Sequence, residues 1–106
     1  YLMNTPMNTR YKITRIDAQG NPTLTLEECR NFFSTKSDFE YNDSFSASQN
    51  GVQMKIKGHF FMWQIENAQI PFRFFDGEIY VAASHPIILD KLIEIAQQLE
   101  AVYVEG

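Results

Sequence analysis

The chain offers few side chains that could act as a nucleophile or a general base. Its only cysteine is Cys29, and its only imidazoles are those of His59 and His85. Nucleophilic catalysis needs a Cys or Ser beside a His and an orienting carboxylate. Cys29 falls on the apolar side of a predicted helix, where a thiol is usually a small core residue, and His85 lies at a predicted helix start. We therefore predict no catalytic residue and a non-enzymatic protein.

Motifs for metal or phosphate binding are also absent from the sequence. Neither histidine stands at a metal-ligand spacing, and there is no Cys-x-x-Cys pair, acidic calcium loop or glycine-rich phosphate loop. We expect no cofactor and no metal ion. The acidic group of Asp38, Glu40 and Asp43 lies on or beside one predicted strand. It fits a site for a basic partner and, equally, an edge protected against aggregation.

The most informative segment, residues 52–63, reads Val-Gln-Met-Lys-Ile-Lys-Gly-His-Phe-Phe-Met-Trp. Side chains on a strand point alternately to opposite faces of the sheet. The alternation predicts a half-buried antiparallel strand. On its buried side we place the apolar residues Val52, Met54, Ile56, Phe60 and Met62.

The other side of this strand turns from basic to aromatic along its length and is the candidate binding surface. Trp, Tyr and Arg are enriched at binding hot spots, and contiguous exposed aromatics are uncommon on monomers without a partner. Together with neighbouring strands, the predicted partner-binding residues are Lys55, Lys57, His59, Phe61, Trp63, Arg73, Phe75 and Tyr80. The same aromatics also fit a second small core, covered by a helix, the N-terminal arm or a second copy of the chain.

Composition restricts the class of protein. With 106 residues, 44 % of them hydrophobic and 21 % charged, the chain has the size of one globular domain. Aromatic residues make up 14 % of the chain, which argues against disorder because each buries a large area. We predict a single α+β domain over residues 10–106. Residues 1–9 are expected to be a flexible N-terminal arm or an expression remnant.

Charge and cysteine content suggest where the protein acts. The formal net charge of −4 disfavours neutralisation of a phosphate backbone over a broad surface. One cysteine cannot form an internal disulfide, so the cysteine content gives no indication of an oxidising compartment. No segment approaches the roughly 18 to 20 apolar residues that span a bilayer. We expect a cytoplasmic protein that does not enter a membrane.

Capping and turn signals locate the predicted elements. Thr25 and Glu28 form a capping box that predicts a helix over residues 26–35. Asn50-Gly51 and Asp76-Gly77 are hairpin signals, because these residues adopt the positive φ angles of a tight turn. Ser84 is the expected cap of a second helix ending near Glu100, and Pro86 is tolerated in its first turn.

The predicted fold class is α+β, with the element order β-α-β-β-β-β-α-β. The expected strands cover residues 10–16, 39–46, 52–64, 70–75, 78–83 and 102–104. Two hairpins in series with only two helices favour an antiparallel sheet of five to six strands with both helices packed on one face. Pro71 is expected at a strand start or an edge, because it cannot donate to a ladder. The second face of the sheet is left open.

The leading functional hypothesis is a small acidic protein-binding module of inhibitor, immunity or adaptor type. Its partner would be another protein, especially a basic one, with a homodimer as one possibility. A second hypothesis is a small-ligand-binding or enzymatic domain with an aromatic-lined pocket made polar by His59, Arg73 or Tyr80. A third is binding of single-stranded nucleic acid to the same aromatics, although the net charge disfavours it.

Overall fold

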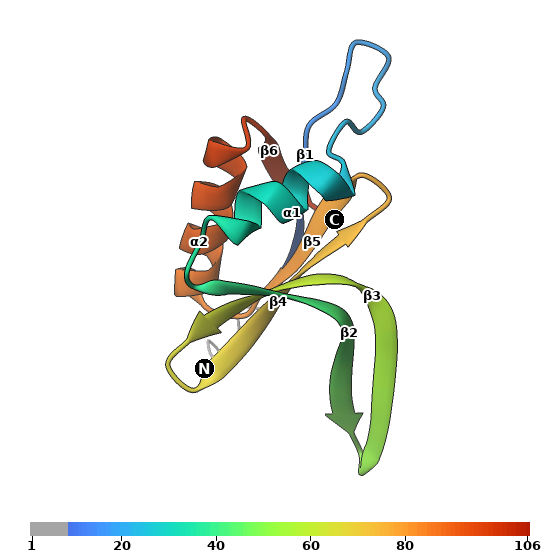
Figure 1. Cartoon of the computed structure of the whole chain (residues 1–106), viewed down its shortest axis with the longest axis vertical. Helices are drawn as coiled ribbons and strands as arrows, with labels where there is room; N and C mark the ends of the chain where they lie inside the picture. Colours follow the sequence, from blue (N-terminus) through green and yellow to red (C-terminus); the bar gives the residue numbers. More distant parts are fainter. Residues whose placement is uncertain (1–8) are drawn as a thin grey trace, which may run out of the picture.

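The computed structural model describes residues 9–106, apart from the side chain of Gln49. In chain order the elements are β1 (Thr9–Thr14), α1 (Leu26–Ser34), β2 (Phe39–Gln49), β3 (Val52–Ile65), β4 (Ala68–Phe75), β5 (Glu78–Ala83), α2 (Pro86–Gln98) and β6 (Val102–Glu105) (Figure 1). The predicted α+β class and element order are confirmed. Of the arm predicted over residues 1–9, residues 1–8 lie outside the described part, and Thr9 begins β1.

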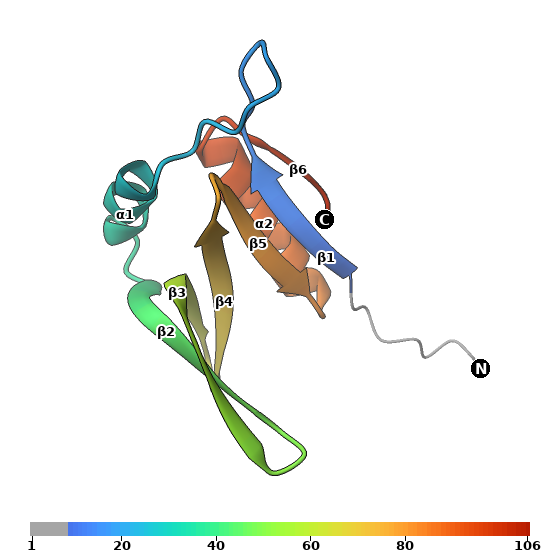
Figure 2. The same ribbon diagram turned by 90° about the vertical axis from the view of Figure 1, so that its right-hand side faces the viewer.

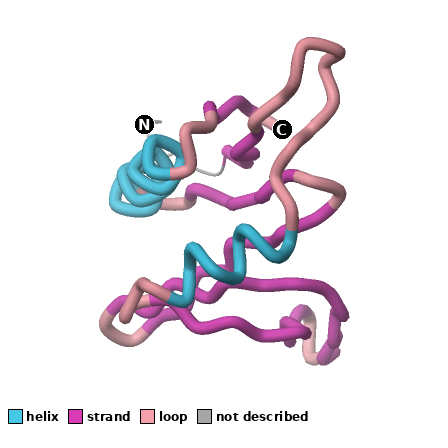
Figure 3. The backbone as a smooth tube through the Cα atoms, turned by 45° about the horizontal axis from the view of Figure 1, so that its top comes forward, coloured by secondary structure: helices cyan, strands magenta, loops and turns pink. Residues whose placement is uncertain are grey.

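The strands form one six-stranded sheet in the order β2-β3-β4-β5-β1-β6. Every neighbouring pair is antiparallel, so the predicted antiparallel sheet is confirmed. β1 lies between β5 and the edge strand β6, so the first strand of the chain is flanked by two strands from its C-terminal part (Figure 2). The longest connection, between β1 and α1, extends away from the sheet (Figure 3).

Three tight turns connect the strands from β2 to β5. Asn50-Gly51 and Asp76-Gly77 have the positive φ angles that the hairpin signals predicted, 54° and 78° at the first and 54° and 80° at the second. The third turn, at Glu66-Asn67, was not predicted because it contains no glycine. Glu66 nevertheless has a φ of 42°, and the pairing of Ile65 with Ala68 closes the turn.

The hairpin of β2 and β3 forms an arm that extends beyond the rest of the sheet (Figures 1 and 2). Its register shifts between Asn42 and Ser44, which marks a β-bulge or irregularity at Asp43. Near the tip, Val52 and Met54 are 59 % and 50 % exposed. The prediction that their side of the strand is buried is wrong for the arm, because no described element packs over it.

The helix starts follow local capping chemistry. The backbone N–H of Glu28 donates to Thr25 Oγ1 at 3.1 Å, as the capping box predicted. The cap of α2 is His85 rather than Ser84, since the N–H of Ile87 donates to His85 Nδ1 at 3.2 Å. Pro86 takes the first helical position, which places the cap on the residue directly before it.

Both helices pack against one face of the sheet and share one hydrophobic core with it. Phe33 of α1 stacks on Phe61 of β3 with ring centroids 4.4 Å apart. Leu92 of α2 is fully buried in the same cluster as Ile13 of β1 and Phe72 of β4. The predicted placement of two helices on one face is therefore confirmed, and aromatic rings dominate the packing under α1.

Removing a ring from the covered face should cost far more stability than removing one from the opposite face. Phe61→Ala is expected to lower the free energy of unfolding by about 3–5 kcal/mol, because it leaves a cavity under α1. Phe75→Ala should cost less than about 1 kcal/mol, since Phe75 is 55 % exposed. Urea unfolding followed by far-UV circular dichroism compares the two variants. Equal losses would contradict the assignment of faces.

Candidate binding site

Strand register identifies the side chains on the sheet face opposite the helices. Ile13 is buried in the helix-covered core, so its neighbour Lys12 points to the other face. Directly paired residues share a face, and the pairs Lys12–Tyr80, Tyr80–Arg73 and Arg73–Phe60 extend this assignment across the sheet. We define the open face by Arg10, Lys12, Phe45, Phe60, Met62, Arg73, Phe75, Tyr80, Ala82, Val102 and Val104.

The structure divides the predicted site between two surfaces. Arg73, Phe75 and Tyr80 lie together on the open face, as expected. Phe61 and Trp63 do not: they are 1 % and 5 % exposed and belong to the helix-covered core. The prediction that these two rings are open to a partner is wrong, and the alternative of a core covered by a helix describes them correctly.

The remaining predicted residues lie on or near the β2–β3 arm, away from the aromatic group. Lys55 and Lys57 are exposed beyond the register shift. His59 lies on the helix side, where its ring stacks on Tyr41 and its Nδ1 is 2.7 Å from the Tyr41 hydroxyl. The Arg30 guanidinium sits over the Tyr41 ring, 4.4 Å from its centroid. These basic residues therefore do not share a site with Arg73, Phe75 and Tyr80.

The sequence-based prediction assigned the helix-covered and open sides of β3 the wrong way round, because the second half of this strand is apolar on both sides. The alternation itself is correct, and Phe60 and Met62 point away from Phe61 and Trp63. Phe60 and Met62 are only 3 % and 2 % exposed although neither described helix covers them. Phe60 packs on Phe45 of β2, with centroids 5.6 Å apart. Periodicity alone could not decide which apolar side the helices would cover.

Trp63 has a structural role between the sheet and α2. Its indole Nε1 donates to Asp38 Oδ2 at 3.0 Å, and Lys91 of α2 lies 3.5 Å from the same oxygen. The Lys91 ammonium also sits over the indole, 5.2 Å from the ring centroid. Burial raises the pKa of Asp38, but hydrogen bonds from Trp63 and its own backbone, and Lys91, outweigh this effect. The net pKa lies below its ordinary value.

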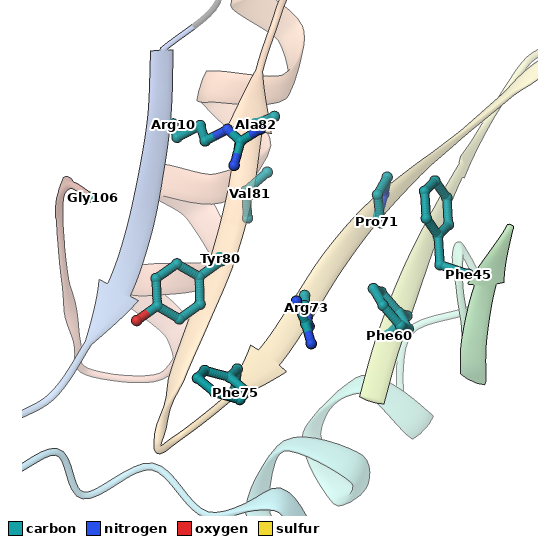
Figure 4. A pocket seen from close by; sticks show the side chains of 10 residues that line it. All are labelled: Arg10, Phe45, Phe60, Pro71, Arg73, Phe75, Tyr80, Val81, Ala82 and Gly106. Atoms are coloured by element: carbon teal, nitrogen blue, oxygen red, sulfur yellow. The ribbon is translucent and has the colours of Figure 1, made fainter. Parts of the chain in front are cut away.

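The open face contains a cavity of about 520 Å³. Aromatic rings and two arginines form most of its wall (Figure 4). The principal lining side chains are Arg10, Phe45, Phe60, Arg73, Phe75 and Tyr80. The sequence analysis missed Arg10, Phe45 and Phe60. Alternation with Tyr11, which packs against the core, was the available signal for Arg10, whereas the register shift displaced Phe45 from the simple pattern.

The cavity lies where β4 and β5 stop pairing. Their ladder contains Arg73, Phe74 and Phe75 of β4. In the same register Phe72 would face Val81 next, and the next pair able to exchange main-chain hydrogen bonds would be Pro71 and Ala82. Pro71 has no N–H, so it cannot donate to the Ala82 carbonyl. The two strands diverge from this point (Figure 4). Pro71 thus lies inside an interior strand and not at a strand start, but on the side facing β5 it borders a local edge.

The charges around the cavity are unevenly paired. Glu78 accepts a hydrogen bond from the Tyr80 hydroxyl at 3.0 Å and pairs with Lys12 at 3.4 Å. Burial raises the pKa of Glu78, but the neighbouring Thr14 hydroxyl, Tyr80 and Lys12 outweigh this effect and hold the pKa below its ordinary value. Burial, followed by the nearby Glu78, raises the pKa of Tyr80, which therefore stays protonated. The negative charge of Glu78 is thus already compensated by neighbouring side chains.

Arg10 and Arg73 have no such partner: neither forms an ion pair with any residue in the range 9–106. The Arg73 guanidinium carbon lies over the rings of Phe60 and Phe75, 5.5 Å and 5.2 Å from their centroids. Its Nε is buried without a hydrogen-bond partner among the described residues. The cavity therefore combines aromatic faces with uncompensated positive charge.

This lining is suited to binding. Among the described residues it contains a phenol and two guanidinium groups but no thiol or imidazole. Cys29 lies in the core, where burial raises its pKa to about 12. Within residues 9–106, no group of three or more His, Cys, Asp and Glu side chains is placed to hold a metal ion.

No protein-family model, curated protein or solved structure matches this chain. Neither described helix is long and apolar enough to cross a membrane. The functional argument therefore depends on the geometry of the site itself. Phe61 and Trp63 do not support the nucleic-acid alternative, because buried rings cannot stack on bases.

The Asp38 carboxylate should make stability depend on pH. The folded state lowers the pKa of Asp38, so the charged carboxylate stabilises the fold. This contribution to the free energy of unfolding is complete above the ordinary pKa near 3.8, and it is lost as the pH falls through the lower pKa of the folded state. Asp38→Asn keeps an acceptor for Trp63 but removes the charge. We expect this variant to lose less stability than wild type between about pH 7 and about pH 3, by less than about 1 kcal/mol since Asp38 is partly exposed.

Urea unfolding at both pH values measures this difference. Asp90→Asn, which removes an exposed carboxylate on α2, is the matched control. An unchanged pH dependence in Asp38→Asn, or an equal change in both variants, would show that the contacts of Asp38 with Trp63 and Lys91 do not stabilise its charged form.

Proposed function

We propose that the chain is a non-catalytic binding module that recognises another protein through the open face. The observation that carries this proposal is the aromatic cavity on a sheet face that neither described helix covers, bordered by two arginines without ion-pair partners. Aromatic and Arg side chains in pockets are typical of interaction hot spots. A partner's anchor side chain would fill the cavity.

The surroundings of the cavity support a contact area larger than the cavity itself. Phe75 is 55 % exposed at one margin. On β6, Val102 and Val104 pair with Thr14 and Lys12, so they point to the same face, where they are 58 % and 40 % exposed. Large exposed apolar patches on monomers mark interaction sites. The open face therefore offers apolar surface on both sides of its arginines.

The charge of the site modifies the kind of partner expected. The net charge of −4 favours basic partners at long range, whereas Arg10 and Arg73 favour acidic groups at the point of contact. Contact charges decide specificity, because they are desolvated when the complex forms. We therefore propose a partner that presents apolar and acidic groups to the open face, whatever its overall charge.

The proposal predicts that one exposed ring on the open face is needed for partner capture. Phe75→Glu should abolish stoichiometric capture from native lysate, because it places a charge beside the cavity. Ile87→Glu is the matched control, since Ile87 is a similarly exposed apolar residue on α2. Quantitative mass spectrometry of the eluates, followed by titration with the purified partner, makes the comparison. Both variants must first show wild-type urea unfolding.

A partner retained equally by Phe75→Glu and wild type would bind elsewhere, and the proposal would then be wrong. A partner lost from both variants would indicate a nonspecific effect of added charge. If wild type captures nothing at stoichiometric level, the second candidate takes precedence.

That second candidate is a site for a small ligand, favoured by the cavity volume of about 520 Å³. Ligand cavities commonly measure about 300–1,000 Å³ and combine apolar walls with a few polar groups. Titration with small aromatic acids should then shift the backbone NMR signals of Arg73 and Ala82 while leaving those of Arg30 unchanged. Trp63 fluorescence is not a suitable probe, because the indole lies on the opposite face. Unshifted Arg73 and Ala82 signals would exclude this class of ligand.

A further inference from the structure

We infer that the cavity binds an extended segment of the partner that carries a carboxylate next to an apolar side chain. The inference rests on the proposed function, since it assumes that the occupant is a protein. It assigns three contacts to the segment: its carboxylate to the arginines, its apolar side chain to the rings, and its backbone to the free edge of β5. Each contact is argued from a different feature of the cavity.

The carboxylate is required by the state of Arg73. A guanidinium group has five N–H donors in a planar fork that matches a carboxylate. The rings of Phe60 and Phe75 hold the Arg73 group in the cavity wall, and its Nε is buried with no described acceptor. Arg73 has no counter-ion among the described residues, and a carboxylate in the cavity would supply one. Arg10 lies across the cavity and adds a second cation (Figure 4).

The extended backbone follows from the hydrogen-bond directions in β5. Phe75 and Glu78 flank a two-residue turn, so their main-chain groups point towards each other across the β4–β5 ladder. Main-chain direction alternates along a strand, and the groups of Tyr80 and Ala82 point the same way as those of Glu78. Tyr80 faces Arg73, but Ala82 has only Pro71 opposite. Pro71 cannot donate to the Ala82 C=O, so an extended peptide could donate a main-chain N–H to this carbonyl.

The apolar side chain is placed by the rings and by a glycine beside them. Phe45 and Phe60 form an aromatic wall next to Arg73. Gly58 adjoins this wall: a Cβ added there would lie 3.2 Å from the Phe60 ring and 3.4 Å from Arg73 Nε. Because Gly58 has no side chain, the β3 backbone can lie close to both groups. A methyl group at Gly58 would crowd the place where the carboxylate and the apolar side chain meet.

A library of random ten-residue peptides, displayed and selected on immobilised full-length chain, tests the ligand chemistry while the partner is still unidentified. Selected peptides should be enriched in sequences that place Asp or Glu within two residues of an aromatic or aliphatic residue. The best peptide is then synthesised with its acid changed to the amide, and with its C-terminus free or amidated. These forms distinguish a side-chain carboxylate from a terminal one.

Fluorescence anisotropy titration of the best peptide tests the assigned residues. Arg73→Gln should weaken binding about 10- to 100-fold, as expected for loss of a charge-assisted hydrogen bond. Arg73→Lys should restore binding only in part, since an ammonium cannot form the planar fork. Gly58→Ala should weaken binding without changing the charge. Arg30→Gln, which removes the same charge from the helix side, should leave the affinity within about 2-fold.

Enrichment of basic or uncharged peptides, or no enrichment, would overturn the inference. So would equal losses in Arg73→Gln and Arg30→Gln, provided that urea unfolding shows both variants folded. The proposed function can survive this failure: a captured partner whose binding needs Phe75 but not Arg73 would still use the open face. Conversely, a selected acidic peptide that binds in the absence of any captured partner would support the cavity chemistry alone.

Discussion

The hydrogen-bond donor that Pro71 lacks is the constraint on which the candidate site depends. In an antiparallel ladder alternate residue pairs exchange main-chain hydrogen bonds, and the β4–β5 ladder ends at Arg73–Tyr80, the last such pair before Pro71 would meet Ala82. Proline usually avoids interior strands for this reason. Here the missing bond opens the sheet locally, and the space between the diverging strands is lined by side chains from β1 to β5. One imino acid thus converts a continuous sheet face into a cavity.

The sheet covers its two apolar faces by different means. Under the helices, Phe33 stacks on Phe61 and ordinary core packing excludes water. On the open face, Phe60 is almost as buried, yet its cover consists of Phe45 and the guanidinium of Arg73. A guanidinium is weakly hydrated and stacks on aromatic faces, so it can shield a ring while keeping its charge available. The Arg73 guanidinium, which shields Phe60 on this face, can therefore also act as a recognition group.

Local signals in the sequence were sufficient for much of the fold. The glycine turns and the Thr25 cap depend on a few adjacent residues, so they were predicted together with the element order. The choice of face for Phe61 was not, because it depends on Phe33, which is distant in the chain. Predicting the cavity needs further information, because the effect of Pro71 can be deduced only when the residue opposite it in β5 is known to be Ala82. Register is non-local information that periodicity does not contain.

The same distinction applies to charge. Net charge is additive over the chain, and its value of −4 predicts the sign of the long-range field. Contact charge depends on which residues are already paired: Glu78 faces Lys12 and Tyr80, while Arg10 and Arg73 have no described counter-ion. An acidic protein can therefore present a cationic site. Since screening weakens the distant charges more than the partly buried ones, the arginines should govern recognition once a partner is in contact.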